Sequence, residues 1–478
     1  MLVFASIAIE VLLLILYYIL GFNTIDTGLQ IGCIILVAVY AFIFIYHSQK
    51  GELRNCWAKP SNLFVAGFLI VYYQFLLDYL LGYKTASSFL DPTIVNFATL
   101  ISTVGFISFV VAYVRKPIAI NNTKVIPVVP KLNVLVVFQI VFFVLFVKSI
   151  DVLKFITGAD AYDPASSASM DYEYAFQAVN IVLLMTVCFQ NRDKSLSLWG
   201  VIKNIPLISI ILIFLYLILR LLSGDRGPVI YTLLVIFYAY IYLARKRFRF
   251  IYILVFFVIG ATFVSLLGIA RSSDLDMSFS ERMLSATNEL KEDSRAGGES
   301  TLSPITKELA FSYLSYEVMV KGMLKDNDGF KNGAYQGVVL VNIIPYASGW
   351  LHKEFNLTRD ETSSSYYATY KYLGTDPSWG LGTNCIGDFY MDWGIVGVLF
   401  CMYFVGLLFK WVDNLLFVKD KTYVTPAMLA LAFCYASEAI YMPRSNITGL
   451  LKLFAFVLIL FFVSKFFGKK KMYHTVYE

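Results

Sequence analysis

PTIVNFATLISTVGFISFVVAYV occupies residues 92–114, and these 23 residues include no Asp, Glu, Lys or Arg. A helix rises about 1.5 Å per residue, so roughly 20 apolar residues cross the hydrocarbon core of a bilayer, which is about 30 Å thick. Arg115 and Lys116 follow directly and end the apolar stretch. The stretch therefore predicts a helix that spans a membrane.

Similar stretches recur along the whole chain. Of its 478 residues, 58% are hydrophobic and 15% are charged, and the mean hydropathy is +0.69. Soluble proteins have about 45–50% apolar and about 25% charged residues. This composition excludes a soluble enzyme of several domains and predicts an all-α polytopic membrane protein with about twelve transmembrane helices. These occupy residues 1–20, 28–46, 61–82, 92–114, 132–147, 174–190, 205–222, 228–244, 250–270, 392–410, 423–442 and 447–466.

Lys and Arg residues favour the loops on one side of the predicted helices. Alternate short loops contain 21 of them on one side and 5 on the other. Because basic residues are enriched in cytoplasmic loops, this bias predicts that the N- and C-termini are both cytoplasmic. The five on the opposite side are Lys84, Lys148, Lys154, Arg226 and Arg444.

Residues 271–391 form a long segment on the predicted non-cytoplasmic side. The segment contains 11 Lys and Arg and 16 Asp and Glu, a net charge of −5, which leaves +11 for the rest of the chain. Ser303 and Pro304 are typical of a helix start, and apolar residues follow at helical spacing over 307–321, with Gly322 as a stop. We expect a small helical subdomain on the membrane surface. The chain would then divide into helices 1 to 9 (1–270), this subdomain (271–391), and helices 10 to 12 with a basic cytoplasmic tail (392–478).

The sequence has no motif for a nucleotide or metal site. It lacks the P-loop, the dinucleotide-binding fingerprint, H-E-x-x-H and paired C-x-x-C. Six cysteines and three histidines leave little for a disulfide framework or a histidine-based metal site. The predicted cytoplasmic loops are too short for a nucleotide-binding domain. We therefore expect no metal and no cofactor, and either an ion gradient or a substrate that arrives already activated in the membrane.

Three arginines lie where predicted helices meet the non-cytoplasmic side. Arg226 lies beside Asp225 in SGDRGP, a tight turn at 223–228; Arg271 follows the ninth helix; and Arg444 lies in MPRSN, a second tight turn. Guanidinium groups match the geometry and charge of phosphate, so this group predicts binding of a lipid-linked diphosphate. The alternative is that these arginines contact lipid headgroups or pair with Asp225 and Asp274.

A glycine-rich cluster precedes the tenth helix. GLGTNCIGDFY occupies residues 380–390 and supplies Asn384, Asp388 and Tyr390 at the predicted membrane boundary. Glycines permit tight turns or a close approach of the backbone, which would suit a substrate site. The alternative is an N-capped helix start with an interfacial aromatic belt, which explains the same residues without chemistry.

These motifs resemble those of Wzy-type O-antigen polymerases. The resemblance rests on GDRGP at 224–228, on the large segment late in the chain, and on GTN at 382–384, GDFY at 387–390 and WG at 393–394. It implies a GT-C-like membrane glycosyltransferase of the bacterial inner membrane, acting in lipopolysaccharide biosynthesis. Such enzymes join undecaprenyl-diphosphate-linked oligosaccharide repeat units on the periplasmic face, without nucleotide or metal, and usually work with a chain-length regulator.

The resemblance also implies roles for single residues. Arg226, Arg271 and Arg444 occupy places where the family uses arginines to hold the diphosphate, and they would stabilise the negative charge that grows on the leaving oxygen. The attacking hydroxyl needs at most a weak general base, for which His352, Asp388 and Glu438 are candidates.

Each base candidate has a plainer interpretation. His352 is alternatively a surface loop histidine beside Lys353 and Glu354, and Glu438 the ion-pair partner of an arginine such as Arg220 or Arg444. Asn384, Tyr390, Asp225 and Glu438 are the candidate substrate-binding residues.

Two other functions fit the same topology. An O-antigen ligase would share the arginines and give weight to His352 as the base. A lipid-linked oligosaccharide flippase or secondary transporter would place polar residues near the middle of the membrane in broken helices. The fifth, eighth and ninth predicted helices carry almost no ionisable residue, and a simple carrier has no need of a segment of 121 residues, so the polymerase is favoured.

Overall fold

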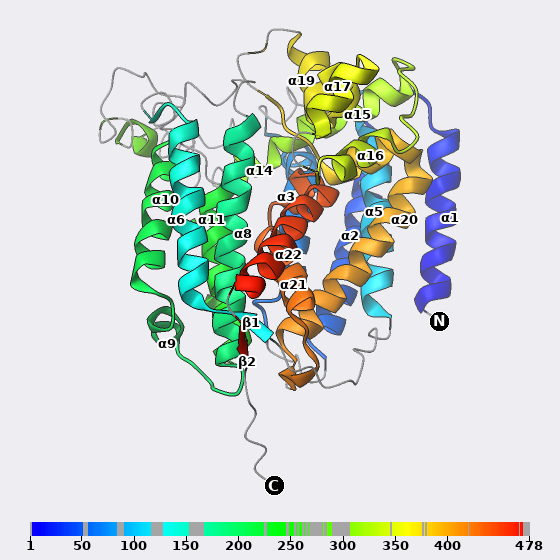
Figure 1. Cartoon of the computed structure of the whole chain (residues 1–478). Coiled ribbons are helices and arrows are strands. Elements are labelled where there is room, and N and C mark those ends of the chain that lie inside the picture. Colours follow the sequence, from blue (N-terminus) through cyan, green and yellow to red (C-terminus); the bar gives the residue numbers. More distant parts are fainter. Residues whose placement is uncertain are drawn as a thin grey trace. The chain divides into compact units, whose positions relative to one another are not determined.

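The chain folds almost entirely into helices, as the computed structural model in Figure 1 shows. Among the residues that the structure describes, eight helices are long and apolar enough to span a membrane, and three further apolar helices are shorter. The described residues are 2–50, 56–83, 90–115, 128–152, 167–223, 227–244, 248–252, 255, 258–260, 262, 266, 281, 284–288, 306–344, 347–374, 377, 380–418, 420–467 and 469–471.

The prediction of an all-α polytopic membrane protein is confirmed, apart from one short two-stranded sheet. Eleven of the predicted stretches coincide with apolar helices of the structure. The predicted ninth helix, residues 250–270, lies mostly outside the described residues. The total of twelve therefore stays a prediction.

Contacts divide the chain into two compact units. Unit 1 comprises Met1–Lys116, Phe248–Lys410 and Ala439–Thr448, and unit 2 comprises Pro117–Arg247, Trp411–Glu438 and Gly449–Glu478. The predicted division at 270 and 391 follows chain order, whereas these units combine segments that are distant in the sequence.

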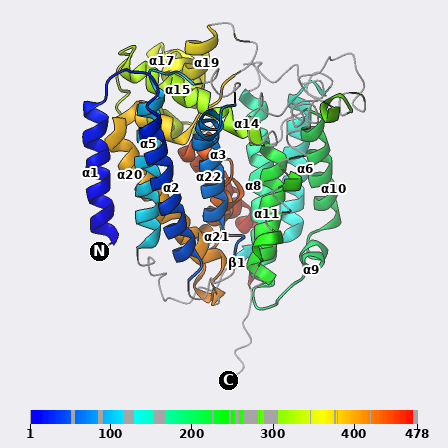
Figure 2. The ribbon, with the colours of Figure 1, turned by 180° about the vertical axis from the view of Figure 1, so that it is seen from behind.

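Unit 1 packs membrane helices beneath a layer of shorter helices. Figures 1 and 2 both show α15, α17 and α19 at the end of the unit opposite the N-terminus of α1, and Figure 2 shows α2 alongside α5. The long helices are α1 (Leu2–Ile19), α2 (Thr27–Ser48), α3 (Pro60–Leu80), α5 (Val95–Val114) and the start of α20 (Cys385–Leu416). The short ones are α14 (Lys307–Ala310), α15 (Ser312–Leu324), α16 (Ala334–Val341), α17 (Ala347–Phe355), α18 (Arg359–Thr362), α19 (Ser364–Leu373) and the 3-10 turn η5 (Met442–Arg444).

Polar bonds hold α1 against the rest of unit 1. The Tyr40 hydroxyl donates to Ser6 Oγ at 2.7 Å, and the Ser108 hydroxyl donates to Glu10 at 2.8 Å. Phe4, Val11 and Leu12, on the other side of the helix, are exposed. Because a polar group gains much from a partner when no water is present, these bonds orient α1 more specifically than apolar packing does.

The prediction that Gly322 stops a helix is wrong. Gly322 lies inside α15, which continues to Leu324. A Cβ atom at this position would come within 1.8 Å of the Tyr367 hydroxyl of α19, so the glycine permits α15 and α19 to pack closely. The predicted helix start at Ser303 and Pro304 lies outside the described residues.

The tenth predicted helix begins earlier than expected. α20 starts at Cys385, not at residue 392, and therefore includes Asp388 and Tyr390 in its first two turns. Gly394 then interrupts the helix with a φ of 65°, a conformation that glycine adopts without steric strain. The second part of the glycine-rich cluster, from Cys385 onward, thus forms helical turns that a kink separates from the rest of α20.

Unit 2 packs six apolar helices. A short antiparallel ribbon pairs Val128 with Lys471 and Pro130 with Lys469. α10 ends at Leu222 and α11 begins at Gly227. The predicted tight turn falls between them, and its residues 224–226 lie outside the described residues. The elements are β1 (Val128–Pro130), α6 (Leu132–Ser149), α8 (Ser167–Gln190), α9 (Leu198–Lys203), α10 (Leu207–Leu222), α11 (Gly227–Ala244), η4 (Lys421–Tyr423), α21 (Pro426–Ser437), α22 (Leu450–Phe467) and β2 (Lys469–Lys471).

Replacing Gly406 by Ala should destabilise unit 1. A Cβ atom there would meet the Phe109 carbonyl oxygen of α5 at 2.3 Å, and such overpacking costs about 1–3 kcal/mol. Gly32→Ala is the matched control, because nothing lies within 4 Å of its added Cβ atom and alanine favours a helix by about 0.5–1 kcal/mol. Thermal unfolding in detergent should show a lower midpoint for Gly406→Ala alone, and equal midpoints would contradict this contact.

Candidate functional site

The first turn of α20 places Asn384 and Asp388 together. Asn384 caps the helix, because its Oδ1 accepts a hydrogen bond from the Gly387 amide at 3.0 Å. The Thr383 hydroxyl donates to Asp388 Oδ1 at 2.6 Å, and the Ser364 hydroxyl of α19 lies 2.7 Å from the Thr383 hydroxyl. Because the Thr383 proton is directed at Asp388, the Ser364 hydroxyl can donate to the Thr383 oxygen, and the three side chains form a chain of hydrogen bonds that ends at the carboxyl group.

Tyr72 of α3 connects this turn to the loop that carries Arg444. Its hydroxyl contacts Asn384 Oδ1, lies 3.1 Å from the Pro443 carbonyl oxygen and accepts from the Ile386 amide at 3.1 Å. The loop approaches α3 at Gly67, where a Cβ atom would come within 2.2 Å of the Ile440 carbonyl oxygen. Two sequence regions that were predicted separately, around Asn384 and Arg444, therefore meet at one tyrosine hydroxyl.

Two polar atoms of this cluster are buried without a hydrogen-bond partner among the described residues. They are Asn384 Nδ2, a donor, and Asp388 Oδ2, an acceptor. Both side chains are at most 1% exposed. Because buried polar groups are normally paired, these two atoms are suited to receive hydroxyl groups of a ligand. Arg444, one residue beyond Pro443, is half-buried.

Tyr390 lies in the second turn of α20 and contacts α1. Its hydroxyl is 2.6 Å from that of Tyr17, and its side chain is fully buried. This position fits a helix-packing contact as well as it fits the predicted substrate-binding role.

Asp392 connects α20 to α16. Its two carboxylate oxygens accept from the Tyr335 and Gln336 amides at 3.2 and 3.0 Å. Gln336 Oε1 in turn accepts from the Thr448 hydroxyl at 2.7 Å, four residues beyond Arg444. Through these bonds, α16 connects the loop that carries Arg444 to the kink of α20. No sequence motif indicated this role for Asp392 or Gln336.

The other predicted site residues lie outside the described residues or in other parts of the structure. Asp225, Arg226 and Arg271 lie outside the described residues. The backbone of His352 lies in α17, and its side chain is outside the described part. Glu438 is half-buried in unit 2, where it follows the last residue of α21.

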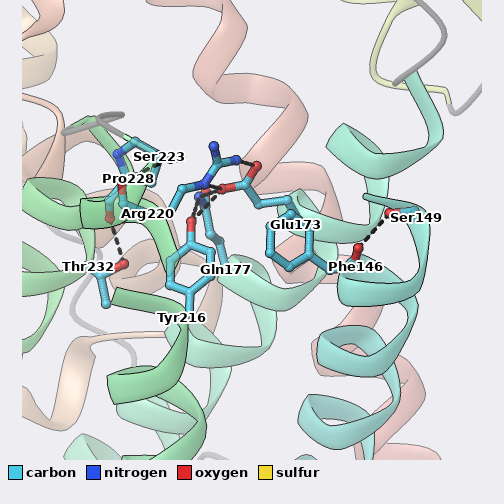
Figure 3. A network of polar contacts seen from close by, with 9 residues as sticks. All are labelled: Phe146, Ser149, Glu173, Gln177, Tyr216, Arg220, Ser223, Pro228 and Thr232. Carbon is cyan, nitrogen blue, oxygen red and sulfur yellow. Dashed lines mark hydrogen bonds and ion pairs between the residues drawn. The ribbon is translucent and has the colours of Figure 1, made fainter. Parts of the chain in front are cut away.

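Unit 2 contains an ion pair that the sequence analysis missed. Arg220 of α10, one of the partners considered for Glu438, pairs with Glu173 of α8, and its Nε donates to Glu173 Oε1 at 2.8 Å. Figure 3 shows Tyr216 and Gln177 directed at the same carboxylate, and the Tyr216 hydroxyl donates to it at 2.5 Å. The two charged side chains are only 12% and 10% exposed. Their spacing of 47 residues, across two helices, leaves no pattern in the sequence.

This network fixes the end of α10. The Ser223 hydroxyl donates to the Arg220 carbonyl oxygen at 3.0 Å (Figure 3), directly before the undescribed residues 224–226. On the same first turns of α8, Asp171 accepts from Lys452 of α22 at 2.7 Å. α8 therefore supplies carboxylates to two basic residues of unit 2.

A buried acid lies behind the α20 turn in unit 1. α15 packs against α20 where a Cβ atom on Gly387 would come within 2.4 Å of Met319 Sδ. Glu317 of the same helix is buried, and one of its oxygens accepts from the Asp91 amide at 3.2 Å. Burial raises the pKa of the Glu317 carboxyl well above its ordinary value of 4.5. Asp91, paired with Lys321, has a lowered pKa because its Thr93 hydrogen bonds and this ammonium outweigh its own desolvation.

A family model described as O-antigen polysaccharide polymerase Wzy matches residues 1–473. No match was found among curated proteins or among solved structures. No group of three or more His, Cys, Asp and Glu side chains suited to a metal ion occurs in the described ranges.

Replacing Glu173 by Ala should destabilise unit 2. Removing one partner of a buried ion pair costs about 3–5 kcal/mol, whereas an apolar replacement of both partners is nearly neutral. The double variant Glu173→Leu/Arg220→Met should therefore regain most of the unfolding midpoint that Glu173→Ala loses. Asp171→Ala, at a more exposed pair, should lose less. If the double variant is as unstable as Glu173→Ala, the loss of stability does not come from an unpaired Arg220 charge alone.

The raised pKa of Glu317 predicts a stability that falls as the pH rises. The folded state holds this proton more tightly than the unfolded state, so between pH 4.5 and the raised folded pKa the free energy of unfolding decreases. Glu317→Gln should remove this decrease and raise the thermal midpoint at pH 8 relative to wild type.

Glu361→Gln is the control for this pH dependence, with the opposite sign. Bonds from the Thr358 amide and hydroxyl lower the pKa of Glu361, so its contribution is present above the unfolded pKa and is lost in acid. Thermal midpoints from about pH 3 to pH 8 test both variants, because the contribution of Glu361 is lost only below pH 4.5. Parallel curves for wild type and Glu317→Gln would show that the acid is ionised in the folded protein.

Proposed function

Because the chain belongs to the O-antigen polysaccharide polymerase Wzy family, we propose that it is a glycosyltransferase that joins undecaprenyl-diphosphate-linked oligosaccharide repeat units. The growing chain would leave its diphosphate carrier and pass to a hydroxyl of the next repeat unit. The reaction would take place on the periplasmic face of the bacterial inner membrane, with both termini cytoplasmic and a GT-C-like arrangement of about twelve helices. A separate chain-length regulator is a proposed partner.

The observation that carries this proposal is the meeting of Asn384 and the Arg444 loop at Tyr72. A glycosyl transfer from a lipid diphosphate requires a cation for the leaving group and polar groups for the incoming sugar, close to each other. The Arg444 loop would supply the cation, and the N-terminal turn of α20 would supply the polar groups. On the basis of the sequence motifs, we propose that Arg226 and Arg271 also contribute positive charge to the leaving-group site.

Arginine side chains can stabilise the leaving diphosphate. Negative charge grows on the bridging oxygen as the glycosidic bond breaks, and a permanently charged fork of donors stabilises it. In the same site Asn384 Nδ2 would donate to a sugar hydroxyl. Asp225 and Tyr390 remain proposed binding residues, and Glu438 a proposed partner of the diphosphate arginines or of substrate.

Asp388 is the proposed general base. Its Oδ1 is occupied by the Thr383 hydroxyl, which leaves Oδ2 as the atom to accept the proton of the attacking sugar hydroxyl. The Ser364 and Thr383 hydroxyls hold the carboxylate in one orientation, so Oδ2 would keep its direction when the proton arrives. His352 is the alternative base, and a central role for it would favour a ligase.

Full-length protein in liposomes, supplied only with undecaprenyl-diphosphate-linked repeat units, should produce a ladder of polymer. Arg444→Ala should reduce the rate by about 10²–10³-fold, because it removes a donor to the developing charge, and Arg226→Ala should do the same. Asp388→Asn should also lose polymer, since an amide does not accept the proton. Gel analysis of the sugar products over time measures all three.

Arg359→Ala is the matched control, because Arg359 is an exposed arginine of α18 that lies over the Tyr366 ring. It should leave the ladder unchanged. Normal ladders from both Arg226→Ala and Arg444→Ala would overturn the diphosphate role. Movement of substrate across the bilayer without a ladder would indicate a flippase, and transfer only to an added lipid A core would indicate a ligase.

A further inference from the structure

α16 exposes apolar side chains and buries a polar one, which is the opposite of what a helix that faces water does. Its exposed side consists of Ala334, Gly337 and Leu340, and Ile344 continues this surface beyond the helix end. Leu340 and Ile344 are 49% and 64% exposed, whereas the polar Gln336 is only 6% exposed. A helix on a protein surface in water normally presents polar residues outward. The environment of α16 is therefore apolar.

The surrounding sequence has the composition of a membrane-embedded piece. Residues 332–352 contain no Asp, Glu, Lys or Arg, although the segment 271–391 contains 27 such residues among its 121. α16 itself has only 8 residues, about 12 Å of helix, which is too short to cross about 30 Å of hydrocarbon. It can enter one leaflet from the side but cannot span the bilayer.

The exposed surface of α16 begins at the lipid-facing side of α20. Trp393, which is 44% exposed, lies between the two helices: Cβ atoms added at Gly333 and Gly397 would come within 3.0 and 2.3 Å of its side chain. Beyond Trp393, the side chains of Val396, Phe400 and Phe404 are exposed along α20. Because α20 is a candidate membrane span, this stripe contacts lipid.

Backbone bonds fix α16 beside that stripe. The Lys331 amide donates to the Met391 carbonyl oxygen at 2.8 Å, and Asp392 accepts from the first amides of α16. α16 is therefore held at the level of the kink at Gly394. Figure 1 shows it lying across the end of α20.

α17 has the character of a helix at the membrane boundary. Trp350 and Phe355 are exposed with ring centroids 6.0 Å apart, and the charged Lys353 and Glu354 lie beside them. Tryptophan together with charged side chains is typical of the headgroup region.

We propose that α16 and Ile344 are inserted into the adjacent membrane leaflet, where Leu340 and Ile344 contact acyl chains, with α17 at the level of the lipid headgroups. The partner of this surface is the bilayer, because the surface meets the exposed apolar stripe of α20 at Trp393. This assignment does not depend on the proposed reaction or on the orientation of the chain.

Collision accessibility of spin labels tests the insertion directly. Leu340→Cys and Ile344→Cys, in the full-length protein in phosphatidylcholine and phosphatidylglycerol liposomes, should collide with oxygen, and their collision rate with a water-soluble nickel chelate should be lower by about tenfold than at Lys353→Cys, the control on α17. The unsubstituted protein, treated identically, gives the background from the native cysteines, and the thermal midpoint verifies that each variant is folded.

Three results would overturn the proposal. Equal nickel accessibility at positions 340 and 353 would place α16 in water. Exclusion of both oxygen and nickel at 340 would show that another protein or a second copy of the chain covers it. A label at position 344 that collides little with oxygen, while the label at 340 is lipid-exposed, would show that only the helix is inserted. The proposed surface would then not continue to Ile344.

Discussion

A polar side chain between helices in a bilayer has no water to bind, so it must find its partner inside the protein. Both units of this chain follow this constraint. In unit 1, the Tyr72 hydroxyl lies between the side-chain oxygen of the helix cap Asn384 and the Pro443 carbonyl oxygen, and it thereby joins segments more than 300 residues apart. In unit 2, Glu173 satisfies Arg220 and Tyr216 together. The fold is selected by apolar stretches, but its specific contacts come from the few polar groups among them.

The same constraint explains why the cluster at Asn384 is notable. Most buried polar atoms around it are paired, while Nδ2 of Asn384 and Oδ2 of Asp388 have no partner in the described part of the chain. A donor and an acceptor on successive turns of one helix suit a ligand rich in hydroxyls. The loop that carries Arg444 meets the same turn at the Tyr72 hydroxyl and is held to α16 through Thr448 and Gln336.

Length and apolarity were sufficient to predict the eleven apolar helices that the structure describes, because a span needs only a count of residues. They did not reveal the partners of polar groups. Tyr72 is one of several tyrosines in its stretch, and nothing local distinguishes it from Tyr73. Gly322 has the pattern of a helix stop, yet it serves close packing against Tyr367. Asn384 and Asp388 were recognised as a cluster because they are local in sequence, whereas the Glu173 and Arg220 pair depends on tertiary structure alone.

The contact between Tyr17 and Tyr390 has a consequence for biogenesis. The two hydroxyls are 373 positions apart, and a chain elongating at roughly 5–20 residues per second needs about 20–75 s to synthesise that interval. During this time α1 is already made, while its partner on α20 does not yet exist. The first helix therefore completes its docking only when α20 arrives, and a chain truncated before α20 lacks this contact of Tyr17.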